Sequence, residues 1–72
     1  MNDTPEADPS PKGILTGQEY TILLLIGDRL MNKEIAERLN ITVDTVKFHI
    51  KNIYRKLEVN NRKQALELAK QL

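Results

Sequence analysis

Between positions 44 and 57, cationic and aromatic side chains recur at helical spacing beside a regular apolar pattern. At about 100° of turn per residue, the apolar residues fall on one narrow stripe: Val46, Ile50, Ile53 and Leu57. The opposite face carries three cations, one acid and one aromatic ring: Lys47, Lys51, Arg55, Asp44 and Phe48. Helical lysines can reach phosphates and base edges of nucleic acid. A purely solvated helix face is the alternative, although Phe48 has no reason to lie on one.

The chain holds few of the side chains that catalysis or metal binding needs. His49 is its one histidine, cysteine is absent, and no cluster of carboxylates stands out. A nucleophile and its base cannot be assembled from this set, nor can a zinc site of the usual kind. We therefore expect no enzyme activity, no cofactor and no metal. His49 lies at the border of the apolar stripe and is expected to pack at the edge of the core.

A first helix is predicted to begin at Thr16 and to continue toward Leu30. Thr16 and Glu19 have the spacing of a capping box, and Leu15 before the cap is a candidate hydrophobic staple. Apolar residues then recur at intervals of three and four, which predicts an inward stripe: Ile22, Leu23, Ile26 and Leu30, thickened by Leu24 and Leu25.

A short helix and a tight turn are predicted just before the helix that carries the cations. The short helix runs from about Asn32, its expected N-cap, to Leu39, and Asn40 suits the left-handed conformation of a turn. Thr42 is the expected cap of the next helix, which ends near Leu57. This spacing is typical of a helix-turn-helix, whose second helix enters the major groove of DNA.

A fourth helix is predicted from Asn61 or Arg62 to the end of the chain. One of its sides is apolar, with Ala65, Leu68, Ala69 and Leu72. Arg62 is expected to anchor the start of this helix, with a phosphate contact as the alternative, and Tyr54 is expected to be half-buried. Because no strand-like alternation competes, the predicted fold class is all-α: a four-helix bundle containing a helix-turn-helix.

Composition divides the chain into a tail and one domain. Residues 1–13 hold all three prolines and are expected to form a flexible linker or tail, and residues 14–72 the folded domain. The tail carries a net charge of −2 and the domain +3, which weakly indicates an anionic partner. The sequence has neither a membrane-spanning apolar stretch nor the features of a signal peptide, so we expect a cytoplasmic protein.

Four segments, in order and with matching separations, resemble the C-terminal DNA-binding domain of LuxR-type regulators (the LuxR/GerE/NarL group). They are LTGQE at 15–19, NKEIAERLNIT at 32–42, TVKFHIKNIYRKL at 45–57 and V-x-N-R-x-x-A at 59–65. The resemblance covers about residues 15–72. It implies a four-helix bundle with its third helix in the major groove. It also implies sequence-specific binding of double-stranded DNA by a transcriptional regulator, for example as the output domain of a response regulator.

The resemblance further implies roles for individual residues. The positions that face the DNA groove correspond to Lys47, Phe48 and Lys51. Phosphate contacts are expected from Lys33, Thr45, Asn52 and Arg55. The fourth helix often forms a homodimer contact in this family, which here would use the exposed positions Leu66, Glu67 and Lys70. Phe48 could contact a thymine methyl or a sugar, or be covered by a partner.

The chain departs from the family pattern around its first helix. Gln18 stands where arginine is frequent, Thr21 where a second glutamate is, and Met31 where a small hydroxyl residue is usual. Arg29 lies near the position where glycine commonly ends the helix, with Gly27 slightly earlier. Two other functions stay open: a helical protein-interaction module, and a domain like region four of sigma factors that contacts RNA polymerase as well as DNA.

Overall fold

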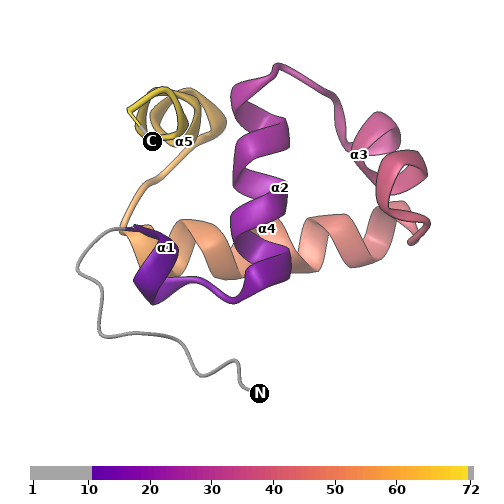
Figure 1. Ribbon diagram of the computed structural model, residues 1–72, viewed down its shortest axis with the longest axis horizontal. Helices are drawn as coiled ribbons and strands as arrows, with labels where there is room; N and C mark the ends of the chain where they lie inside the picture. Colours follow the sequence, from indigo (N-terminus) through magenta and orange to yellow (C-terminus); the bar gives the residue numbers. More distant parts are fainter. Residues whose placement is uncertain (1–10, 72) are drawn as a thin grey trace.

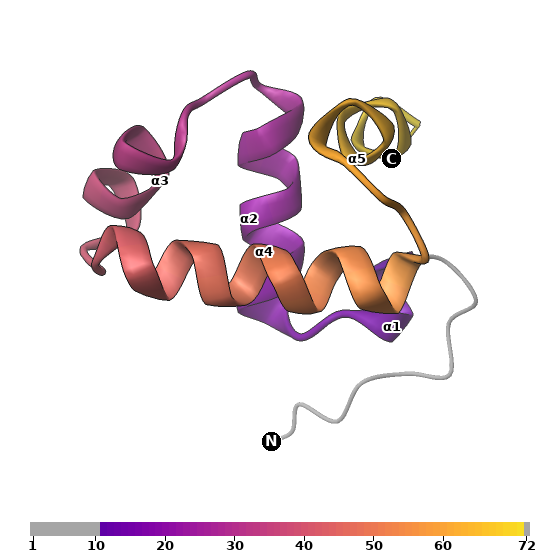
Figure 2. The ribbon, with the colours of Figure 1, turned by 180° about the vertical axis from the view of Figure 1, so that it is seen from behind.

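The computed structural model describes residues 11–71, which form five helices and no strand. They are α1 (Pro11–Ile14), α2 (Gly17–Gly27), α3 (Asn32–Leu39), α4 (Val43–Leu57) and α5 (Arg62–Ala69). Helix α2 crosses α4. Helix α3 lies by the N-terminal end of α4, and α5 lies beside the C-terminal end of α2 (Figures 1 and 2). The predicted all-α class and its four helices are confirmed. Among these helices, none is long and apolar enough to cross a membrane.

Helix α1 begins before the predicted start of the domain. Residues 1–10 lie outside the described residues, so the linker stays a prediction there, but Pro11–Ile14 forms a helical turn. This turn spans the predicted boundary between residues 13 and 14, and the division of the chain into a tail and a domain stays a prediction. Proline suits the first position of a helix, where its fixed φ is already helical and no N–H is needed. The turn contacts α2 and α4, and Leu15 behind it is buried as expected of a staple.

Helix α2 forms the centre of the core. Its inward side chains are almost completely buried: Ile22, Leu23 and Ile26. The predicted capping box is confirmed, because the Thr16 hydroxyl accepts the Glu19 N–H at 3.1 Å and Glu19 Oε1 accepts the Thr16 N–H at 3.0 Å. Both α4 and α5 pack on this helix.

The end of α2 differs from the prediction. The helix stops at Gly27, and Leu30 lies beyond it while still packing on the core. Leu24 was wrongly placed in the core, since it is 39% exposed. The chain turns at Arg29, which has a φ of 67° and donates its N–H to the Ile26 carbonyl at 2.9 Å. This left-handed conformation favours glycine and costs other residues about 1–2 kcal/mol.

The connections on either side of α3 define the helix-turn-helix. The N-cap of α3 is Met31 rather than the predicted Asn32, and the Met31 N–H donates to Glu34 Oε1 at 2.7 Å. Asn40 adopts the expected left-handed conformation, with a φ of 59°. Thr42 caps α4 as predicted, and its hydroxyl accepts a backbone N–H from the first turn at 3.0 Å.

Helices α4 and α5 each bury one side. The stripe of α4 is buried at Val46, Ile50 and Ile53, whereas Leu57 at the helix end is only partly buried. Helix α5 buries Ala65 and Ala69, Leu68 is half-buried, and Leu72 lies outside the described residues. A Cβ built on Gly27 would lie 2.9 Å from the Ala69 Cβ. Small residues therefore let α5 approach the end of α2 closely.

Candidate nucleic-acid interface

Helix α4 presents Lys47, Phe48 and Lys51 to solvent, as predicted. Phe48 is 61% exposed, and its ring meets that of His49 in an edge-type arrangement with centroids 5.7 Å apart. His49 is half-buried, which confirms its place at the edge of the core. Among residues 11–71, neither lysine has a hydrogen bond or an ion pair. These three side chains thus contribute little to the fold and are available to a ligand.

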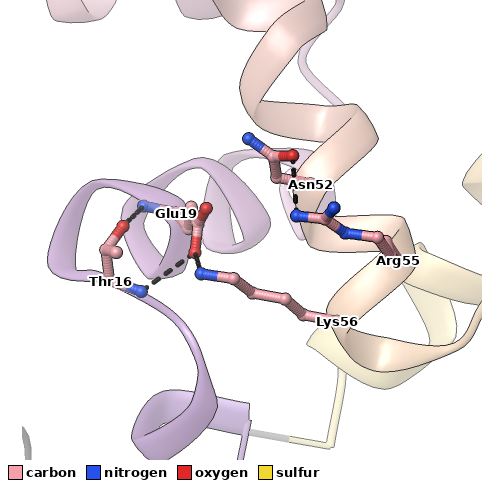
Figure 3. A network of polar contacts seen from close by, with 5 residues as sticks. All are labelled: Thr16, Glu19, Asn52, Arg55 and Lys56. Carbon is pink, nitrogen blue, oxygen red and sulfur yellow. Dashed lines mark hydrogen bonds and ion pairs between the residues drawn. The ribbon is translucent and has the colours of Figure 1, made fainter.

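The four residues predicted to contact phosphates divide into two groups. Thr45, Asn52 and Arg55 lie on α4, and Asn52 Oδ1 accepts a hydrogen bond from Arg55 at 3.1 Å (Figure 3). The hydroxyl of Thr45 is 2.8 Å from that of Thr42, so part of its hydrogen-bonding capacity serves the cap of α4. Lys33 stands apart from the other three, because it lies in the first turn of α3.

Two hollows lie beside α3 and the start of α5, and the first of them also borders α4. The first, of about 330 Å³, is lined by Asn32, Lys47, Ile50, Lys51, Tyr54 and Arg62. The second is lined by Met31, Asn32, Lys33 and Arg62. Both therefore share Asn32 and Arg62, and both lack carboxylates in their lining. Cations from three helices come together here, which the order of the residues along the chain did not reveal.

Arg62 attaches the start of α5 to the connection between α2 and α3. One guanidinium nitrogen donates to Asn32 Oδ1 at 2.9 Å, and the other donates to the Leu30 carbonyl oxygen. The expectation that Arg62 anchors the fourth helix is confirmed. Its partners lie about thirty residues away in the sequence, so no helical periodicity could have identified them.

An ion pair fixes the last turn of α4 against the first turn of α2. Lys56 Nζ lies 2.7 Å from Glu19 Oε1, and the Glu19 side chain is only 6% exposed (Figure 3). Burial raises the pKa of Glu19, but hydrogen bonds from Lys56 and Thr16 and the charge of Lys56 outweigh it. The pKa of Glu19 is therefore lowered overall. The two residues lie 37 positions apart in the sequence, so this contact was missed.

The residues proposed for a dimer contact do not all share one environment. Glu67 and Lys70 are exposed, as expected. Leu66 was predicted to be exposed, but it is partly buried and packs against the core. It lines a hollow with Ile26 of α2. The side of α5 that packs on the core therefore includes Leu66 as well as the predicted alanines.

The family model of bacterial regulatory proteins of the luxR family matches residues 13–69. The chain is 43% identical over 70 residues to the HTH-type transcriptional regulator AlkS of Alcanivorax borkumensis, covering 90% of this chain and 8% of that protein. Identity is 53% over 55 residues with the transcriptional regulatory protein LiaR of Bacillus subtilis (76% of this chain, 26% of LiaR). With the response regulator protein VraR of Staphylococcus aureus it is 51% over 53 residues (74% and 25%). The chain spans less than a third of each relative, and the relatives are named as regulators rather than enzymes.

Proposed function

This chain belongs to the luxR family of bacterial regulatory proteins and is a DNA-binding domain of a transcription regulator, and on that premise we propose how it reads DNA. Helix α4 enters the major groove, and Lys47, Phe48 and Lys51 contact base edges. The observation that carries the proposal is that these side chains project from α4, directly after α3 and its turn, without a role in the core.

The dimensions and chemistry of α4 suit this task. A helix with its side chains is about 10–12 Å across, and the major groove is about 12 Å wide. Lysine ammonium groups donate to O6 and N7 of guanine, while an apolar ring such as Phe48 can contact the methyl group of thymine. Thr45, Asn52 and Arg55 contact phosphates along one side of α4, and Lys33 does so from α3. Such contacts fix the register of the helix in the groove.

The domain acts on DNA as a pair and as the output part of a longer cytoplasmic regulator. Glu67 on α5 and Lys70 at its C-cap are exposed, and their opposite charges can pair across a twofold axis. Two copies joined in this way place two α4 helices on repeated half-sites. The length of the relatives supports a larger protein, since the chain matches only 26% of LiaR.

Selection of binding sites from random duplexes with the purified domain tests this proposal. We expect one enriched sequence, present as one or two half-sites at fixed spacing. Lys51→Ala should weaken binding to it about tenfold or more, whereas Lys63→Ala, an exposed lysine on α5, should not. No enriched sequence, or equal binding by the two variants, would overturn the proposal and favour a protein-interaction module.

A further inference from the structure

The two hollows that share Asn32 and Arg62 are here together called the Arg62 groove. Its polar lining comes from Asn32 and Lys33 on α3, Lys47, Lys51 and Tyr54 on α4, and Arg62 on α5. Four of these six residues are cationic, and none of the residues lining either hollow is acidic. Concentrated positive charge without a carboxylate partner favours an anion as the ligand.

Arg62 has donors left for such a ligand. A guanidinium group carries five N–H donors in a fixed plane, and the bonds to Asn32 and Leu30 use two of them. Those two bonds also hold the group where it lines both hollows. Planar, fixed N–H donors match the oxygens of a phosphate well.

Tyr54 supplies a neutral donor at the same place. It lies on the same flank of α4 as Lys47 and Lys51, one or two turns farther along the helix. Burial raises the pKa of the Tyr54 phenol, although the nearby charge of Arg62 opposes this. The hydroxyl therefore keeps its proton at neutral pH and can donate it in a hydrogen bond.

The position of the groove identifies the anion. A helix that fills the major groove has one flank toward each DNA strand. Thr45 and Asn52 lie on one flank of α4, and the Arg62 groove borders the opposite flank. From this geometry we propose that the Arg62 groove seats a backbone phosphate of the DNA strand on the side of α3 and α5, with Arg62, Tyr54 and Lys33 as its ligands. This inference rests on the proposed function and adds a phosphate contact on the flank of α4 opposite Thr45 and Asn52.

The test compares groove variants on a selected duplex in which single phosphates are replaced by neutral methylphosphonates. The variants are Lys33→Ala and Tyr54→Phe, which leave the core intact, together with Arg62→Gln if circular dichroism shows that it folds. Lys63→Ala is the matched control, since it removes a neighbouring exposed cation outside the groove.

We expect one methylphosphonate position to weaken wild-type binding about tenfold, and the groove variants to lose little more on that duplex. On unmodified DNA, Lys33→Ala should lower the slope of log affinity against log salt by about one, and Lys63→Ala should not change it. Additive losses at every position, or an unchanged slope, would overturn the inference. If Lys51→Ala still weakens binding in that case, the proposed function survives without this phosphate site. Absence of any DNA binding by the wild type would overturn both.

Discussion

Helices α2 and α4 cross each other, yet they use their surfaces in opposite ways. Five of the 11 residues of α2 are buried, including the charged Glu19, whereas only three of the 15 residues of α4 are. Helix α2 is covered by α4 on one side and α5 on another. Helix α4 keeps one outer side exposed to solvent, which includes Lys47, Phe48 and Lys51.

The difference separates stability from recognition. Each inward residue of α2 is held by neighbours from other helices, so its loss should lower the free energy of unfolding. The outer residues of α4 have few neighbours, so their loss should change DNA affinity and leave the fold intact.

The largest effect is expected at the centre of α2. Ile26→Ala should lower the free energy of unfolding by about 2–5 kcal/mol, because it leaves a cavity among fully buried side chains. Urea denaturation followed by circular dichroism measures it. Leu24→Ala on the same helix is the control, since that leucine is 39% exposed, and it should cost much less. Equal losses would contradict the buried centre assigned to α2.

A smaller loss is expected at the contact between the two helices. Glu19→Gln keeps an oxygen for the Thr16 N–H but removes the negative charge that faces Lys56. Because hydrogen bonds to charged groups contribute about 1.5–3 kcal/mol, thermal and urea unfolding should show a loss in that range. The double variant Glu19→Gln, Lys56→Met should lose little more stability than either single variant. If the two single losses simply add, the two residues do not act as a pair.

Recognition should respond at the outer face of α4. Lys47→Ala should reduce affinity for the selected DNA by about 1–3 kcal/mol, measured by fluorescence anisotropy. The same substitution should change the free energy of unfolding by no more than about 0.5 kcal/mol, as is usual for exposed residues. A comparable loss of stability would show that α4 does not separate the two tasks.

Acid should weaken the contact between α2 and α4. Since the pKa of Glu19 is lowered in the folded state, its charge contributes fully to the free energy of unfolding above the ordinary carboxyl pKa of about 4.3. It is lost as the pH falls through the lowered folded value. The free energy of unfolding should therefore fall more steeply below about pH 5 in the wild type than in Glu19→Gln. Parallel curves would contradict a lowered pKa.

The smallest effect is a gain at the end of α2. Arg29→Gly should raise the free energy of unfolding by about 0.5–1 kcal/mol, because glycine adopts the left-handed conformation without steric cost. The added freedom of glycine in the unfolded chain offsets part of the gain. Thermal melts compare this variant with Arg38→Gly, which replaces a helical residue of α3. If the conformation at Arg29 is strained, Arg29→Gly should raise the melting temperature and Arg38→Gly should lower it.

Local patterns were predictable from the sequence, and contacts between distant residues were not. The capping box of Thr16 and Glu19 and the buried stripe of α4 depend on residues three or four positions apart, where helix geometry fixes the neighbours. The pairs Glu19–Lys56 and Arg62–Asn32 join residues 37 and 30 positions apart. They depend on how the helices cross, which no single helix encodes. Leu66 was misplaced for the same reason, because its burial is decided by α2.

The exposure of Lys47, Phe48 and Lys51 has an evolutionary consequence. Since these side chains have few contacts with the rest of the domain, mutations there meet little selection for folding. Under the proposed function, a new DNA target can then arise by substitution at these three positions, while the scaffold of α2 and α5 is inherited unchanged. Copies of such a domain could then diverge toward different DNA sequences without first passing through an unstable intermediate.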